Sequence, residues 1–367
     1  MNEQLKYQIA LSMLPGIGGV LARNLVAYVG NVEEIFTASI QTLQKIPGIG
    51  EYNARRIKNA GVLQKAEQEI EFIQKNNIKA SFYTDQDFPR RLKACIDAPV
   101  LIYTKGNVKL DEQRVISIVG TRNATDYGKA VVDELLKAFA ERNYEILVVS
   151  GLAYGIDISA HRSALKYNIS TVGVVAHGLD RLYPALHKET ASKMMEQGGM
   201  VSDFPSDTKI DPQNFVKRNR IIAGLADATI VVESAEKGGA LITAEIASSY
   251  NRDVFAFPGR AGDSYSKGCN QLIKNSGASL IEGIDDLEFF MGWEKTKKQE
   301  AVQSSLFIEL KPDEQKIVDL LKEQGELFID QIAAEVELPV SRISTIMINL
   351  EFKNVLTALP GKMYKLR

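Results

Sequence analysis

The sequence predicts an α/β protein whose main domain is a Rossmann-like, doubly wound and mostly parallel sheet. Short β-branched runs recur between residues 115 and 257, and segments of helical periodicity separate them. Glycine-rich turns follow several of these runs, where a strand would give way to a helix. Strands that alternate with helices favour parallel pairing with right-handed crossovers. We therefore expect ligands at the carboxyl ends of the strands.

The strands are predicted from apolar, β-branched composition and flanking turn residues. We expect a strand at each of residues 115–119, 146–150, 170–175, 199–202, 229–233 and 254–257. Two earlier runs, 80–83 and 100–103, would join or extend the same sheet. The Rossmann-like domain is predicted to span residues 81–291.

Residues 1–80 look helical and contain one phrase twice, as Leu14-Pro-Gly-Ile-Gly18 and Ile46-Pro-Gly-Ile-Gly50. A turn of this type between two helices is the signature of the helix-hairpin-helix, here in a SAM-like all-α domain. Its glycines let backbone N–H groups approach a DNA phosphate. The alternative is a tight turn that only packs one hairpin on the other. Both interpretations stay open.

The chain after residue 291 divides into a polar linker, 292–311, and a compact C-terminal domain, 312–367. Its predicted order is a helix at 313–324, the segment 329–336, a turn at Leu338-Pro339, a second helix from Ser341 to about Lys353, and two short strands around Pro360-Gly361. This order is typical of a winged helix. Acidic residues outnumber basic ones in the domain, which favours protein interaction over DNA reading.

The net charge of −2 excludes a uniformly basic DNA-coating protein, so any nucleic-acid site must be a local basic patch. Two cysteines without a pairing pattern fit a reducing compartment. The N-terminus lacks a leader pattern, and no apolar run reaches membrane-spanning length. We expect a cytoplasmic protein without a membrane partner.

The turn at Ser150-Gly151 sits between a predicted strand and helix, an arrangement that directs backbone N–H groups at an anion. The loops after other strands carry cations that could contact phosphate. Arg122 follows the first strand. Arg181 shares a loop with His177 and Tyr183, and this loop would supply a cation and two stacking rings. Further polar candidates are Lys209, Lys217, Arg218, Asn219, Arg220, Lys267 and Asn270. Together they predict a phosphate track along one crevice.

Signals for catalysis are weak. The three histidines, His161, His177 and His187, have no metal-binding spacing, and His161 reads as a hydrogen-bonded structural residue. The first strand is not followed by a dinucleotide fingerprint, and Ser150 lacks a nucleophile elbow. We expect no enzyme activity, no cofactor and no metal.

Taken together, these phrases resemble the DprA/Smf family of bacterial DNA-processing proteins. The matching segments are Phe88-Pro-Arg-Arg-Leu92, Pro99-Val-Leu-Ile-Tyr103, Val119-Gly-Thr-Arg122, Val149-Ser-Gly151 through Asp157, Ala160-His161, Gly178-Leu-Asp180, Tyr183-Pro184, Arg218-Asn-Arg-Ile-Ile-Ala-Gly224, Gly239-Ala-Leu-Ile-Thr243, Pro258-Gly259, and Gly268 with Asn270. One departure is Gly238, where the family usually has serine.

The resemblance implies a recombination mediator that binds and protects incoming single-stranded DNA and helps load the RecA recombinase in natural transformation. It also implies a homodimer formed through the Rossmann-like domain. By the same likeness, Arg122, Arg181, Lys209 and Lys267 would contact phosphates. Ser150, Gly151, Arg218, Asn219 and Arg220 would line the same pocket.

Two alternatives remain. The Gly238-Gly239 turn with Thr243 and Glu245 looks like the phosphate turn of a phosphoribohydrolase, which would make the protein a nucleotide-processing enzyme. The chain could also be a scaffold whose pocket has lost its ligand.

Overall fold

The computed structural model describes residues 3–59, 61–293, 310–353 and 355–367. The chain forms two compact units, Met1–Ile284 and Asp285–Arg367. The finer division predicted from the sequence, with boundaries at residues 80, 291 and 311, remains a prediction.

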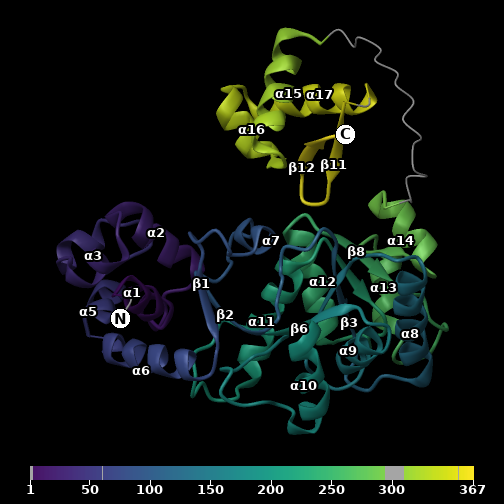
Figure 1. The fold of residues 1–367 in the computed structure, drawn as a ribbon, viewed down its shortest axis with the longest axis horizontal. Coiled ribbons are helices and arrows are strands. Elements are labelled where there is room, and N and C mark those ends of the chain that lie inside the picture. The colour runs from purple at the N-terminus through teal and green to yellow at the C-terminus, as the bar shows by residue number, and fades with distance from the viewer. Residues whose placement is uncertain (1–2, 60, 294–309, 354) are drawn as a thin grey trace. The chain divides into compact units, whose positions relative to one another are not determined.

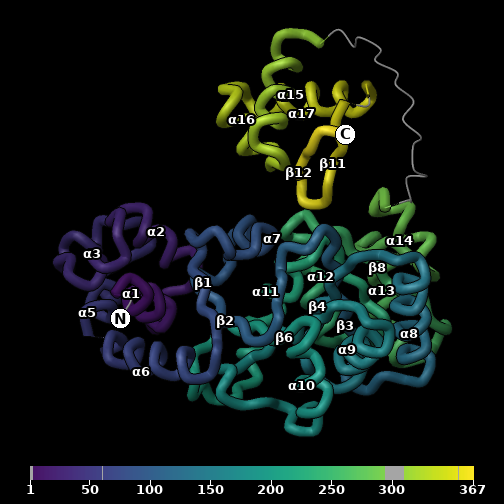
Figure 2. Tube along the Cα trace, in the orientation of Figure 1, coloured from purple at the N-terminus to yellow at the C-terminus, as the bar shows by residue number. Residues whose placement is uncertain are grey.

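The first unit begins with a group of helices, which the trace in Figure 2 shows in purple before the chain enters the sheet. Their bounds are α1 Glu3–Ser12, α2 Gly19–Val29, α3 Val32–Thr37, α4 Ile40–Gln44, α5 Glu51–Asn59 and α6 Val62–Lys75. The two repeated phrases form the α1–α2 and α4–α5 turns, as predicted. Gly16 and Gly48 adopt φ values of 77° and 82°, which favour glycine.

The two turns pack against each other's hairpins. A Cβ built on Gly16 would meet the Arg56 guanidinium at 2.8 Å, and one on Gly48 would meet the Leu21 side chain at 2.6 Å. Asn24 also donates to the Pro47 carbonyl at 3.4 Å. The repeat therefore builds a paired helix-hairpin-helix in which each turn is a packing surface for the other.

The sheet of the first unit has the strand order β1-β2-β6-β5-β4-β3-β7-β8-β9. The bounds are β1 Lys79–Phe82, β2 Leu101–Gly106, β3 Val115–Val119, β4 Leu147–Gly151, β5 Ser170–Val174, β6 Gly198–Ser202, β7 Ala228–Val231, β8 Asp253–Ala256 and β9 Ser279–Leu280. The strands from β6 to β9 pair in parallel, whereas β1 and β2 add an antiparallel edge. All eight strands predicted from the sequence are present, and the short β9 was not predicted.

Helices cover both faces of this sheet (Figure 1). The chain runs through α8 Asp126–Glu141, α9 Ile156–Lys166 and α10 Lys188–Gln197 while it builds β3 to β6. It then returns through α11 Pro212–Leu225 to β7 and continues with α12 Gly239–Ser249 and α13 Lys267–Lys274. Right-handed crossovers put these two groups of helices on opposite faces. The strand order therefore reverses between β3 and β7, where doubly wound sheets bind ligands.

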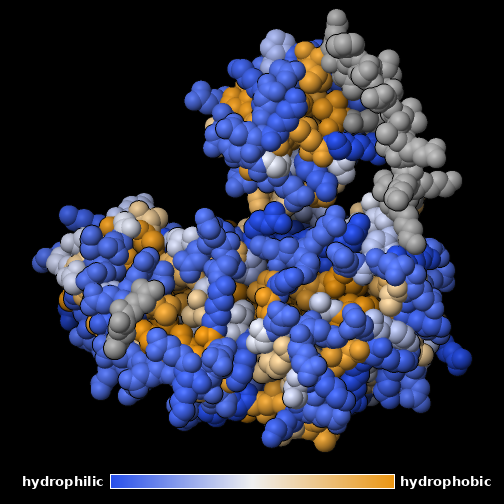
Figure 3. All heavy atoms as spheres, viewed as in Figure 1, coloured by the Kyte–Doolittle hydropathy of each residue, from blue (hydrophilic) through white to orange (hydrophobic). Residues whose placement is uncertain are grey.

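The buried apolar side chains that stabilise this unit include two large clusters. One joins the N-terminal helices to β1, β2 and the underside of α10, with Leu25, Ile70 and Tyr103 among its members. The other lies beneath α11 and α12 and includes Val149 and Ile222. Outside, the face drawn in Figure 3 is mostly hydrophilic with scattered apolar patches. Among the described residues, no helix is long and apolar enough to cross a bilayer.

The second unit contains α14 Ile284–Met291, of which Ile284 belongs to the first unit, and a small α/β fold. That fold consists of α15 Pro312–Gln324, α16 Ile329–Val336, α17 Val340–Phe352 and a three-stranded sheet in the order β10-β12-β11. The strands are β10 Leu327–Phe328, β11 Leu356–Leu359 and β12 Met363–Leu366. The winged-helix prediction is confirmed. Most of the predicted linker 292–311 lies outside the described residues.

Candidate nucleic-acid interface

A cavity of about 300 Å³ opens at the point where the strand order reverses. Its walls come from the loop after β3, the loop after β7, the first turns of α9 and α11, and the start of α12. Gly238 and Gly239 form the turn into α12, so the positive end of that helix borders the cavity. The cavity therefore occupies the place where the sheet topology predicts a ligand.

Arg122 lines the mouth of this cavity, where the sequence placed a phosphate contact. Its guanidinium lies 5.4 Å from the centre of the Phe215 ring, which comes from α11. Tyr183 approaches Phe215 edge-on at 6.1 Å and is 44% exposed. A cation and two rings therefore share one rim, an arrangement that suits both the phosphates and the bases of a single strand.

Arg218 lies in the cavity wall rather than on its rim, because the side chain is 4% exposed. It donates to the Val174 carbonyl at 2.5 Å and lies close to Asp157. Burial raises the pKa of Asp157, and the charge of Arg218 opposes that rise. A Cβ on Gly151 would come within 2.2 Å of Arg218 and 2.3 Å of Asp157. Gly151 thus makes room for this buried pair.

Three other predicted pocket residues are held by the protein itself. Ser150 is fully buried, and its hydroxyl donates to the Ile118 carbonyl at 2.6 Å. Asn219 lines the cavity and donates to the Gly239 carbonyl at 3.3 Å. Asn270 accepts from the Gly259 N–H and donates to its carbonyl. Direct DNA contact by the Ser150 side chain is therefore wrong for this structure, because no part of it reaches the surface.

Arg220 also departs from its predicted place. It forms an ion pair with Asp203 at 2.6 Å and donates to the Asp97 carbonyl, so its side chain fastens α11 to neighbouring loops. Arg220 does not line the cavity. On α11, Lys217 is exposed, whereas Arg218 is buried and Arg220 is partly buried.

The remaining predicted cations lie on the loops and helix starts that follow the strands. Arg181 follows β5 and is held by Asp180 at 2.6 Å and Asp207 at 3.3 Å. Lys209 is exposed in the segment before α11, and Lys267 is exposed at the first residue of α13. All three come from connections at the carboxyl edge of the sheet. The structure thus keeps Arg122, Arg181, Lys209 and Lys267 accessible.

Two residues beside the cavity were not singled out from the sequence. Phe215 supports Arg122, and Lys237 is an exposed cation in the turn before α12. The signal that points to Lys237 is its place beside the Gly238-Gly239 turn, which resembles a phosphate turn. Phe215 carried no such signal, since an aromatic residue near a helix start is ordinary.

The histidines are structural. His161 is fully buried and contacts the Gly151 carbonyl and the Thr171 hydroxyl, each at 2.7 Å, which confirms its predicted role. His177 is also buried, with one ring nitrogen near the Gly178 carbonyl and the other accepting from the Tyr183 N–H. Its predicted role beside Arg181 as a stacking ring is therefore wrong. Within the described residues, no cluster of acids, histidines or cysteines could hold a metal.

The cations beside the helix-hairpin-helix turns contact their own domain. Arg55 pairs with Glu51, Arg56 lies 5.1 Å from the Tyr52 ring centre, and Lys58 donates to the Phe36 carbonyl. DNA contact by these turns stays a prediction.

The fold and the cavity define a doubly wound α/β protein with a cavity at its topological switch point, joined to a paired helix-hairpin-helix and a winged helix. The chain belongs to the DNA recombination-mediator protein A family, the DprA/Smf family, whose model matches residues 79–291. Models of a SAM-like helix-hairpin-helix tandem and a DprA winged helix domain match residues 9–60 and 305–362.

Similar proteins support this assignment. Protein Smf of Synechocystis sp. is 30% identical over 400 residues, covering 100% of both chains. The crystal structure of DprA from Streptococcus pneumoniae superposes with a TM-score of 0.66 at 28% identity, covering 77% of this chain and 96% of the other. A DprA from Helicobacter pylori, studied for its single-stranded DNA binding mode, has a TM-score of 0.52 at 27% identity and covers 59% of this chain and 96% of its own.

Proposed function

We propose that this protein is a non-enzymatic, cytoplasmic recombination mediator that binds single-stranded DNA at the carboxyl edge of its sheet. The observation that carries this proposal is the cavity rim, where Arg122 lies over Phe215 and Tyr183 stands beside it. Cations with exposed rings bind single strands without regard to sequence, because every phosphate is charged and every base can stack. The H. pylori relative, which is described as binding single-stranded DNA, agrees with this proposal.

The proposed contacts are the accessible cations Arg122, Arg181, Lys209, Lys237 and Lys267. Arg218, Gly151 and Asn219 would shape the wall behind them, with Arg218 supplying positive potential from within. Arg181 would exchange its exposed carboxylate partner Asp207 for a phosphate, at little cost because an exposed ion pair contributes under about 1 kcal/mol.

Family membership extends the proposal to partners. We propose that the protein protects incoming single strands, helps load RecA onto them in natural transformation, and acts as a homodimer through its Rossmann-like domain. A RecA strand-exchange assay with and without this protein would test the loading step. Analytical ultracentrifugation would test the dimer.

The central experiment titrates a fluorescent oligothymidylate and a duplex of equal length at about 50 mM and about 200 mM salt. We expect tighter binding of the single strand, with an affinity that falls steeply as salt rises. Arg122→Ala should weaken binding about tenfold or more, because it removes both a charge and the partner of Phe215. Lys193→Ala, which removes an exposed cation of α10 paired with Glu189, is the matched control.

Equal affinity of the parent and Arg122→Ala would contradict the site.

The enzyme alternative needs an acid or base within reach of a nucleotide in the cavity. Glu245, its predicted catalytic acid, is exposed on α12 and does not line the cavity. Release of free base from a nucleoside monophosphate by the parent, and its loss in Glu245→Ala, would reinstate that alternative.

A further inference from the structure

Glu69 connects the N-terminal helices to the core at a single loop. It lies in α6, is only 4% exposed, and its two carboxylate oxygens both accept from the Ser206 N–H at 3.0 Å. The Ser206 hydroxyl donates to the same carboxylate. A buried carboxylate whose oxygens receive backbone and hydroxyl donors is a firm anchor, since leaving those donors unpaired costs about 1–3 kcal/mol each.

The anchored loop, residues 203–209, also packs on the connection that carries Arg181. A Cβ on Gly178 would lie 2.4 Å from the Pro205 carbonyl oxygen and 2.7 Å from the Ser206 Cα, so the two segments are in close contact. The Ser202 hydroxyl, just before the loop, donates to the His177 carbonyl at 2.7 Å. The position of one segment therefore determines the position of the other.

Two groups of the proposed DNA site depend on this loop. Arg181 belongs to the connection that packs on this loop at Gly178, and its guanidinium lies 3.3 Å from the exposed Asp207 carboxylate. Lys209 ends the loop, where its carbonyl accepts from Asn214 of α11. Glu69 thus fixes the middle of the 203–209 loop. This loop ends at Lys209 and lies against Arg181, and both residues are proposed phosphate contacts.

We propose that Glu69 is a positioning residue for single-stranded DNA binding, acting through Ser206 on Arg181 and Lys209. The proposal rests on the proposed function of the cavity rim. It gives the N-terminal helices a part in DNA binding without any contact between those helices and DNA. They would hold the 203–209 loop in the conformation that presents the cations.

Charge makes this proposal easy to distinguish from a simple field effect. Glu69 is an acid, the side chains of Asp180 and Asp207 lie near it, and burial raises its pKa. Removing a negative charge near a polyanion site strengthens binding if only the electrostatic field matters. A positioning role predicts the opposite sign, because the loop loses its anchor. The direction of the change in affinity therefore decides between the two.

The test measures oligothymidylate affinity and its salt dependence for full-length variants. Glu69→Ala should weaken binding about fivefold and lower the salt slope, since Arg181 and Lys209 no longer meet the strand together. Glu69→Gln can still accept from the Ser206 N–H and donate to its hydroxyl, so its affinity should match that of the parent. Glu71→Ala, an exposed glutamate of the same helix, is the control.

A double-mutant cycle tests the route. Glu69→Ala and Arg181→Ala should together cost less than the product of their separate effects, whereas Glu69→Ala and Lys267→Ala should multiply. If Glu69→Ala fails to fold, Ser206→Ala serves instead, with an expected weakening of about twofold because the backbone N–H still reaches the carboxylate.

The outcomes separate this inference from the proposed function. Suppose that the parent binds the strand and Arg122→Ala does not. If Glu69→Ala, or its substitute Ser206→Ala, then binds as tightly as the parent or tighter, the positioning role is wrong and the site stands. If the parent fails to bind single-stranded DNA at all, the proposed function fails and this inference fails with it.

Discussion

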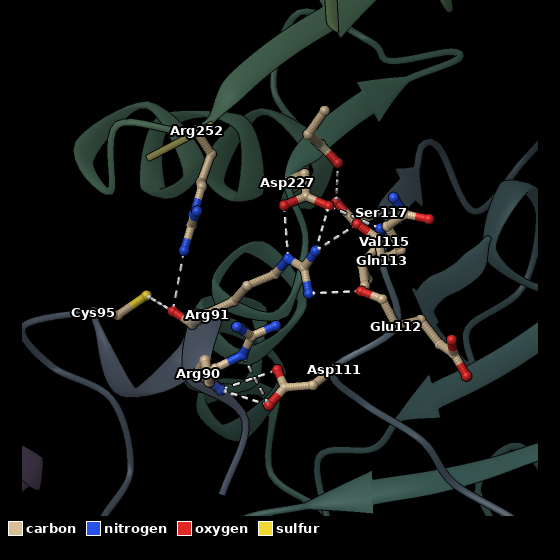
Figure 4. Close-up of polar contacts among 11 residues, drawn as sticks. Arg90, Arg91, Cys95, Asp111, Glu112, Gln113, Val115, Ser117, Asp227 and Arg252 are labelled. Carbon is tan, nitrogen blue, oxygen red and sulfur yellow. Dashed lines mark hydrogen bonds and ion pairs between the residues drawn. The ribbon is translucent and has the colours of Figure 1, made fainter. Parts of the chain in front are cut away.

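Arg91 and Asp227 form a buried, two-pronged ion pair that joins the short helix α7, Arg90–Lys93, to the start of β7 (Figure 4). The Arg91 Nε and a terminal nitrogen donate to the two carboxylate oxygens at 2.6 and 2.9 Å. The guanidinium also donates to the Glu112 and Gln113 carbonyls, and Asp227 accepts from the Val115 N–H. One pair thus holds α7, β3 and β7 together at the edge opposite the proposed DNA site.

Arg91→Ala should destabilise the first unit by about 3–5 kcal/mol, because Asp227 would keep a buried charge without its partner. The neighbouring Arg90→Ala is a matched control. Its guanidinium is half exposed and reaches Asp111 at 3.7 Å, while the Arg90 N–H contact with Asp111 survives the change. The control should cost no more than about 1 kcal/mol. Urea unfolding compares the two, and equal costs would contradict the role assigned to the pair.

Gly151→Ala should destabilise the protein by about 1–3 kcal/mol and weaken oligothymidylate binding, because the added methyl would displace the buried Arg218 or Asp157. Gly239→Ala offers the contrast. No atom lies within 4 Å of its Cβ position, and its φ is not in the left-handed region, so its stability should change by less than about 0.5 kcal/mol. Thermal unfolding measures the stability of both variants. If Gly151→Ala is as stable as the parent, Gly151 does not make room for Arg218 and Asp157.

Eight strands of the sheet could be predicted because each of them is a local apolar run, and local patterns need no knowledge of distant partners. It also predicted the edge that carries the site, since the carboxyl ends of parallel strands must meet. The strand β9 was missed because Ser279 and Leu280 are too few to form a pattern.

The direction of individual side chains could not be predicted in the same way. Arg218 turns inward because it bonds to the Val174 carbonyl near Asp157, and Arg220 turns inward because it pairs with Asp203. These partners lie elsewhere in the chain. Ser150 is buried because a neighbouring strand offers the Ile118 carbonyl. A single sequence shows where cations gather but not which of them already have a partner.

Acid should weaken the fold through His161. Burial lowers the pKa of His161 to about 4, from 6.5 for an exposed histidine. Because the folded state holds the ring neutral, the unfolded state binds more protons between these two values. Stability is therefore full above pH 6.5 and is lost as the pH falls toward about 4, by about 3 kcal/mol from this residue.

Urea unfolding across this pH range measures the loss. His161→Gln should be less stable at neutral pH but should show a shallower decline, because the substituted side chain does not titrate. His177 and His187 also have lowered pKa values from burial, so part of the slope remains in that variant. An unchanged slope in His161→Gln would contradict the assignment of the acid sensitivity to this ring.

Lys237, which lies beside the Gly238-Gly239 turn, should behave as a phosphate contact. It is exposed at the cavity rim in the turn before α12, where its charge adds to that of the helix end. A lysine that neutralises one phosphate of a single strand contributes about 0.7 to the slope of log affinity against log salt. Lys237→Ala should lower that slope by about this amount and weaken binding of all base compositions alike, because a phosphate contact carries no sequence information. Lys193→Ala should leave the slope unchanged. If Lys237→Ala also leaves it unchanged, the strand does not pass the start of α12, and the track must run from Arg122 toward Arg181 alone.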